Sequence, residues 1–211
     1  TIWQQAYEEM PSSGLATFAD IMFGFSTHTA KAERLHNSLI PYYVSVGYPG
    51  DYFFPLLKKH ADQLRVKLQK KGAEKIIAFF DENSLEDTRW RGGHITTQGN
   101  YLFLLEKVLN EPWLGLILKP KRPRSLPERL GPVAKLLTRA QATGRCHVYG
   151  EGMRATPFPP AGAALSADIA IHAHLYASTA GIEAALAGIP TLFLDREGWN
   201  VGRFYTNGLE G

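Results

Sequence analysis

The chain has 211 residues, 45% hydrophobic and 20% charged, a composition that excludes intrinsic disorder and allows one large domain or one domain with part of another. Lysine and arginine total 23 against 20 aspartate and glutamate residues, and this net charge of +3 argues against a protein that mainly neutralises a long nucleic acid. The single cysteine, Cys146, excludes an internal disulfide and a cysteine-rich zinc site, so we expect a cytoplasmic protein.

We expect neither a signal peptide nor a membrane-spanning helix in this sequence, and its ends suggest a cut. The first residues lack the basic and apolar regions of a signal peptide, and no apolar run reaches the roughly 18 residues of a membrane-spanning helix. The chain starts at Thr1 without an initiator methionine and stops at Gly211 in a polar stretch. We therefore expect a fragment of a longer protein, cut short at its C-terminus.

The first third predicts the end of one α/β domain and a connector. Apolar runs at 19–26 and 42–49 favour strands, and residues 29–39 between them favour a helix. An amphipathic pattern at roughly 52–71 predicts a long helix that Gly72 ends. We therefore assign 1–50 to the remnant of an N-terminal α/β domain and 51–72 to a connector helix.

Residues 73–211 predict a second α/β domain. Continuously apolar runs at 76–80, 114–118, 146–149, 167–171 and 191–194 alternate with helical segments near 97–110, 125–144 and 179–187, and Pro132 can break the second of these segments. Runs without polar alternation are typical of parallel strands that are covered on both faces. The expected fold class is α/β, with a Rossmann-like parallel sheet preceded by the tail of another α/β domain.

The start of the last predicted helix can bind an anion. Ser178, Thr179, Ala180 and Gly181 open it at the carboxyl edge of the sheet, where free N–H groups and the helix dipole favour phosphate. Glu183, one turn further, can accept hydrogen bonds from ribose hydroxyls. An ordinary crossover explains the same pattern without a ligand: a serine or threonine N-cap and an acid that complements the dipole.

A family resemblance favours the first interpretation. The string STAGIEAALAGIP at 178–190 resembles the nucleotide-sugar signature of GT-B glycosyltransferases, in particular the UDP-GlcNAc-dependent transferase of peptidoglycan synthesis and the UDP-GlcNAc 2-epimerases. In those families a small-residue helix start precedes a ribose-binding glutamate in the pattern E-x-x-x-x-G-x-P, in which Glu183, Gly188 and Pro190 stand here. The run SVGYPGDY at 45–52 is similar to their interdomain connector. The loop at 81–98 departs from the short glycine-rich turn of the peptidoglycan enzyme.

The resemblance implies a function for the whole chain. It implies the C-terminal, nucleotide-sugar-binding half of a GT-B fold at 73–211, and a metal-independent glycosyltransferase without a cofactor that acts in surface polysaccharide biosynthesis. The expected partners are then a nucleotide-diphosphate sugar and a glycan or lipid-linked acceptor. The expected location is the cytoplasm, with peripheral association at the inner face of the membrane as an alternative. A nucleotide-sugar epimerase and a non-catalytic nucleotide-sugar-binding module are the alternatives.

Basic residues at the ends of the first two strands of this domain are further candidates for the diphosphate. Arg91, Gly93 and His94 form a flexible loop that can close over a diphosphate or be a plain surface loop. Lys119 is the preferred cation after the second strand, because prolines hold the later cations outward.

Other polar and aromatic residues remain open at this stage. Tyr149 and Met153, after the third strand, can pack on a nucleobase or belong to the core. The pair His172 and His174 has the spacing of metal ligands on one strand face, but no third ligand is near in sequence, so we predict no metal site. Two candidate general bases lie in the first third, His28 and Asp20.

Overall fold

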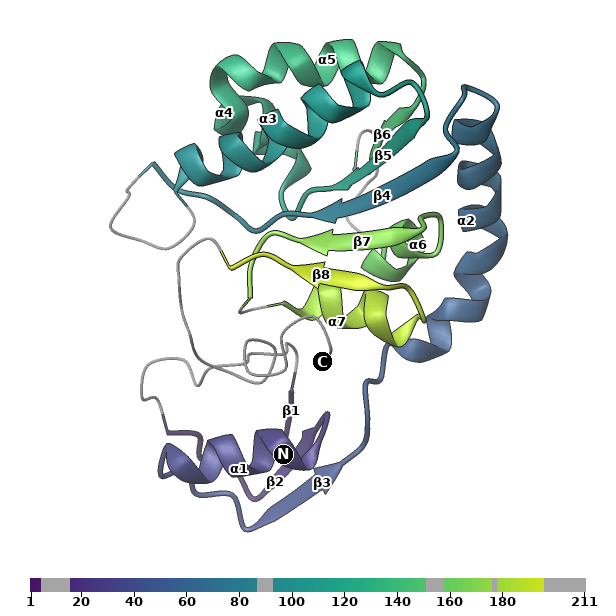
Figure 1. Cartoon of the computed structure of the whole chain (residues 1–211). Coiled ribbons are helices and arrows are strands. Elements are labelled where there is room, and N and C mark those ends of the chain that lie inside the picture. The colour runs from purple at the N-terminus through teal and green to yellow at the C-terminus, as the bar shows by residue number, and fades with distance from the viewer. Residues whose placement is uncertain (5–15, 87–92, 151–157, 176–177, 196–211) are drawn as a thin grey trace.

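The computed structural model describes residues 1–4, 16–86, 93–150, 158–175 and 178–195. Its strands form two parallel sheets, and Figure 1 shows the smaller sheet at the bottom and the larger sheet at the top. The α/β fold class with a Rossmann-like parallel sheet is confirmed, whereas the division of the chain into domains at residues 50 and 72 stays a prediction.

The smaller sheet contains three strands in the order β1 (Ile2–Trp3), β2 (Ile21–Gly24) and β3 (Tyr42–Ser45). The helix α1 (Thr27–Leu35) connects β2 to β3, as predicted, although both strands are shorter than their apolar runs. β1 was not predicted, because two residues are too few to show a periodicity.

The connector helix α2 (Phe54–Gln69) follows a short 3-10 turn at Asp51–Phe53. It buries one stripe against the larger sheet: Leu57, Ala61, Leu64 and Leu68. Gly72 adopts a φ of 98°, which explains why a glycine ends this helical segment.

The larger sheet has five parallel strands. They are β4 (Lys75–Phe80), β5 (Leu114–Lys119), β6 (Cys146–Val148), β7 (Ile169–His172) and β8 (Thr191–Phe193). Their spatial order is β6-β5-β4-β7-β8, and each coincides with one of the five apolar runs of the sequence. The order reverses between β4 and β7, and ligands of open α/β sheets bind at the carboxyl ends of strands at such a point.

Helices cover both faces of this sheet. The helices α3 (His94–Asn110), α4 (Leu126–Leu130) and α5 (Ala134–Ala142) lie on one face, and α2, α6 (Pro160–Ala164) and α7 (Thr179–Leu186) lie on the other (Figure 1). Phe79 packs into the first layer and its neighbour Phe80 into the second, and both are fully buried. Burial on both faces is the reason why these strands are continuously apolar.

Two segments add detail to the sequence prediction. The helical segment predicted at 125–144 contains two helices, α4 and α5, separated by a 3-10 turn at Gly131–Val133. The break that Pro132 allows is therefore present, and Gly131 beside it has a φ of 51°. The helix α6 was not predicted, because its five small residues show no polar face. In the described part of the chain, no helix has both the length and the apolar character needed to cross a membrane.

Candidate functional site

A buried ion pair closes the end of β4. Asp81 is 4% exposed, and Arg129 of α4 donates to its carboxylate over 2.9 Å. The Tyr101 hydroxyl (3.1 Å) and the Lys121 amide (2.5 Å) donate to the same carboxylate. Burial raises the pKa of Asp81, and the Arg129 guanidinium opposes that rise. This carboxylate ties β4 to α3 and α4, and it has little capacity left for a ligand.

His172 and Glu82 lie beside this pair, at the point where the strand order reverses. Glu82 is paired with Lys121, and its Oε1 lies 3.8 Å from Nε2 of His172. His172 is fully buried, and burial lowers its pKa to about 4, so its ring is neutral at neutral pH. Among the described residues, the Nε2 atom has no hydrogen-bond partner.

His172 and His174 are joined through the backbone of the second residue. The Nδ1 atom of His172 lies 2.8 Å from the backbone carbonyl oxygen of His174, so this ring nitrogen faces the backbone. Within the residues that the structure describes, no three histidine, cysteine, aspartate or glutamate side chains gather as metal ligands.

The start of α3 brings a serine and a histidine together. Gly93 is the extended N-cap residue, and Nδ1 of His94 lies 2.7 Å from Oγ of the buried Ser84. The third predicted residue of this loop, Arg91, lies outside the described residues. Sequence reasoning did not single out Ser84, because a lone serine in a polar loop carries no signal of its own.

The start of α7 is partly closed by packing. Ser178 is fully buried at the N-cap position, and in the described structure its hydroxyl has neither a capping bond nor another partner. Thr179 and Ala180 are partly buried. A Cβ on Gly181 would lie 2.4 Å from the Phe193 ring and 3.0 Å from Cβ of His172, so the close packing of α7 on β7 and β8 requires this glycine. The approach of a diphosphate to Ala180 and Gly181 stays a prediction.

Glu183 is the second buried carboxylate near this edge. It is 4% exposed, and each of its oxygens has a donor: the Ala161 amide of α6 at 2.7 Å and the Tyr48 hydroxyl at 2.6 Å. Both donors are neutral, and the carboxylate makes no ion pair within 4.0 Å among the described residues. In this conformation Glu183 therefore acts as a cap for α6 and an anchor for Tyr48.

Tyr48 comes from the connector between β3 and α2. Its ring also makes an edge contact with Phe25, at the end of β2, with 5.4 Å between the ring centroids. Burial and the adjacent Glu183 carboxylate raise the pKa of Tyr48 well above its usual value, so the phenol stays a proton donor. The sequence marked the turn around this residue but gave no sign that it reaches α7, 135 residues further along the chain.

Lys119 interacts electrostatically with both buried acids, Asp81 and Glu183. It ends β5, and burial lowers its pKa, while the carboxylates of Asp81 and Glu183 act in the opposite direction. The structure thus brings Lys119, Ser178 and Glu183 to the carboxyl side of one sheet, as the sequence predicted for them.

Tyr149 belongs to the core in this structure. It is 3% exposed and stacks on Phe158 with 5.1 Å between the ring centroids, and burial raises its pKa to about 12. Met153, the other residue proposed to pack on a base, lies outside the described residues.

The two candidate general bases are not brought together. Asp20 precedes β2, whereas His28 follows it in the first turn of α1, so the residues lie at opposite ends of the strand. Because ligands of parallel sheets gather at the carboxyl ends of strands, only His28 is on the side where a ligand is expected.

Comparison with known proteins gives limited similarity. No family model matches the chain, and no curated protein matches it. HepE of Anabaena, solved in complex with UDP and glucose, is 16% identical with a TM-score of 0.44 over 83% of this chain and 44% of HepE. The N-terminal domain of trehalose-6-phosphate phosphatase from Candida albicans is also 16% identical, with a TM-score of 0.37 over 80% of this chain and 42% of that domain structure. The chain thus spans less than half the length of either solved structure.

Proposed function

We propose that this chain is the nucleotide-sugar-binding half of a GT-B glycosyltransferase, which transfers a sugar from a nucleotide diphosphate to a hydroxyl acceptor in surface polysaccharide biosynthesis. The observation that carries the proposal is the hydrogen bonding of Glu183. One carboxylate oxygen is held by the backbone of α6, and the other accepts from a phenol hydroxyl at 2.6 Å. A ribose hydroxyl is the same kind of donor, so it can replace the Tyr48 hydroxyl without leaving the carboxylate unsatisfied.

The surroundings of Glu183 supply cationic and dipolar groups for a diphosphate. Lys119 is close enough to interact electrostatically with Glu183, and α7 begins one turn before it. The Ser178 hydroxyl, buried without a partner in the described structure, is a further donor. A diphosphate here would lie near the positive end of the α7 dipole.

These groups support catalysis by stabilising the leaving group. When the sugar departs, negative charge grows on the diphosphate, and the amides that open α7 together with Lys119 oppose that charge. One preorganised donor of this kind is worth about 3 to 4 kcal/mol of barrier. This route uses no metal ion, and the acceptor, glycan or lipid-linked, would bind on the side of the smaller sheet.

Titration calorimetry with UDP, GDP, ADP and dTDP tests the binding site. The variant Glu183→Gln keeps one oxygen to accept the Ala161 amide and loses the acceptor for a ribose hydroxyl. Because charge-assisted hydrogen bonds are worth about 1.5 to 3 kcal/mol, we expect the best nucleotide to bind about 10- to 100-fold more weakly. Glu106→Gln, the same change at an exposed position of α3, is the matched control.

The proposal is wrong if no nucleoside diphosphate binds the wild-type chain, or if Glu183→Gln binds each one as tightly. An assay of the full-length protein separates the three functions that the sequence left open. A transferase needs an acceptor hydroxyl, an epimerase interconverts the free nucleotide sugar without one, and a non-catalytic module binds without turnover.

A further inference from the structure

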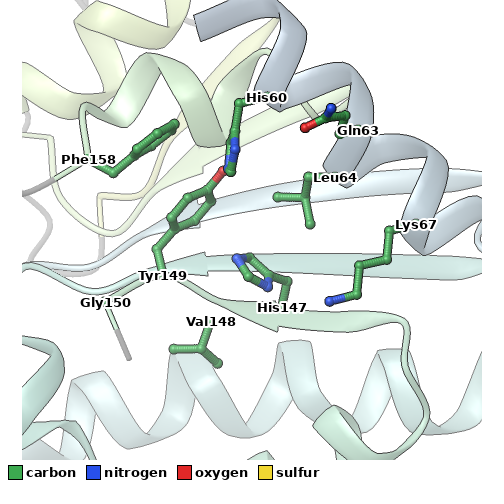
Figure 2. Close-up of a pocket in the computed structure, with 9 residues that line it drawn as sticks. All are labelled: His60, Gln63, Leu64, Lys67, His147, Val148, Tyr149, Gly150 and Phe158. Atoms are coloured by element: carbon green, nitrogen blue, oxygen red, sulfur yellow. The ribbon is translucent and has the colours of Figure 1, made fainter. Parts of the chain in front are cut away.

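A cavity lies away from Glu183, between α2 and the edge strand β6. Its volume is about 310 Å³, and Figure 2 shows the nine residues that line it. Four come from α2 (His60, Gln63, Leu64, Lys67), four from β6 and its end (His147, Val148, Tyr149, Gly150), and the ninth is Phe158. A cavity of this size is at the lower end of the range for small-molecule sites.

The strand order explains why the cavity is there. After β6 the chain crosses to β7 on the far side of β4, and the crossover helix α6 packs over the middle of the sheet, against residues of β4 and β5. Among the described helices, α2 is therefore the one that lies across the cavity from the edge strand on this face. His60, Gln63, Leu64 and Lys67 are spaced so that all lie on one side of α2.

One end of the cavity is aromatic. Tyr149 and Phe158 stack with 18° between their planes, and the His60 ring lies 4.7 Å from that of Phe158, centroid to centroid. The His147 ring meets Tyr149 edge-on at 4.8 Å. Such a surface offers stacking and edge contacts to a flat ring.

The rest of the lining includes one cation, Lys67, and the ring nitrogens of His147. Lys67 is exposed, and in Figure 2 its side chain and that of His147 extend toward the same space. None of the nine lining residues is an aspartate or glutamate. Among the described lining residues, Lys67 therefore attracts an anion and no carboxylate repels it.

We propose that this cavity binds a small flat anion, an aromatic or heteroaromatic ring that bears a phosphate or carboxylate group. The ring lies against Phe158 and His60, which are more exposed than the core residue Tyr149 behind them, and the anionic group lies between Lys67 and His147. The site is distinct from the one at Glu183. The start of α6 lies between them, because Phe158, just before this helix, lines the cavity, whereas the Ala161 amide within it binds Glu183. It does not depend on the proposed function.

Phenyl phosphate is a suitable probe, with inorganic phosphate and benzyl alcohol as the anion alone and the ring alone. We expect phenyl phosphate to bind the chain at least about 10-fold more tightly than either, because both parts of the cavity contribute. Lys67→Met and His147→Gln should each weaken its binding about 3- to 10-fold, as measured by calorimetry or NMR titration.

Two further variants are controls. Lys58→Met removes a charge from the opposite side of α2, where Lys58 pairs with Asp62 at 3.4 Å, and should not change the affinity. Glu183→Gln should also bind phenyl phosphate normally, whatever its effect on nucleotides. Circular dichroism establishes that each variant is folded.

Three results would overturn the proposal. The first is that inorganic phosphate binds as tightly as phenyl phosphate, which would reveal a simple anion contact. The second is that folded Lys67→Met and His147→Gln both keep the wild-type affinity. Loss of phenyl phosphate binding in Glu183→Gln would place the ligand at the other site.

Discussion

Asp81 and Glu183 are buried to the same degree beside the same sheet, but they are held in different ways. Asp81 is neutralised by Arg129 and receives two more hydrogen bonds. The donors to Glu183 within the described residues are both neutral, an amide and a phenol. A buried acid with a cationic partner is fixed, because breaking the pair leaves an isolated charge. A buried acid whose donor is a hydroxyl can exchange that donor for another of the same kind, which suits a binding residue.

The largest effect is expected for Arg129→Met, which leaves the Asp81 charge buried without its cation. We expect the free energy of unfolding at neutral pH to fall by about 3 to 5 kcal/mol. Loss of the guanidinium raises the pKa of Asp81 further, so the native state then keeps a proton that the unfolded state has released. The stability of the variant therefore falls as pH rises, and urea titrations at pH 4.5 and 7 should show a smaller defect at the lower pH. An equal defect at both pH values would mean that Asp81 does not carry the effect.

The pH dependence of stability tests whether His172 is buried as a neutral ring. Its folded pKa of about 4 lies below the value of about 6.5 for an unfolded histidine. The unfolded state thus binds the proton first, so stability should be lost as pH falls from about 6.5 to about 4, by at most about 3 kcal/mol. Comparison of wild type with His172→Gln by urea unfolding across this range checks the prediction. The variant should lose less stability on acidification, and parallel curves would contradict a buried neutral ring.

Removal of the Glu183 carboxylate should have a moderate effect on folding. Glu183→Ala leaves the buried Ala161 amide without its acceptor, which costs about 1 to 3 kcal/mol. Glu183→Gln retains an acceptor for that amide and should recover most of the loss, as measured by chemical denaturation. If the two variants are equally stable, the bond to α6 contributes nothing, and Glu183 is less firmly placed than the geometry indicates.

The smallest effect on stability, and the sharpest test of exchange, is expected for Tyr48→Phe. Loss of one hydrogen bond should lower the free energy of unfolding by about 1 kcal/mol. In contrast, nucleotide affinity should rise about 2- to 10-fold, because the ribose no longer competes with the phenol hydroxyl. Calorimetry with the best-binding nucleoside diphosphate measures this gain. Weaker binding in Tyr48→Phe would show that the hydroxyl assists the ligand instead of occupying its place.

The sequence by itself determined the five parallel strands and most of the helices between them, because each strand is buried on both faces and leaves a continuous apolar run. It also placed Lys119, Ser178 and Glu183 on one side of the sheet, since the carboxyl ends of parallel strands share an edge. It also marked the break at Pro132 within 125–144 but did not indicate α6, because a short helix of small residues has no visible period.

Only the tertiary structure decided what each polar residue contacts. Arg129 reaches Asp81 across 48 residues, and Tyr48 reaches Glu183 across 135. Gly181 is required because Phe193, from the next strand, leaves no room for a Cβ, and the sequence around Gly181 does not show this. The cavity beside β6 depends on a strand order that places α6 over the middle of the sheet and, of the described helices, leaves α2 beside that edge. Local patterns reflect how a segment is buried. Hydrogen-bond partners and cavities arise when distant segments come together, so they cannot be predicted from the pattern of one segment.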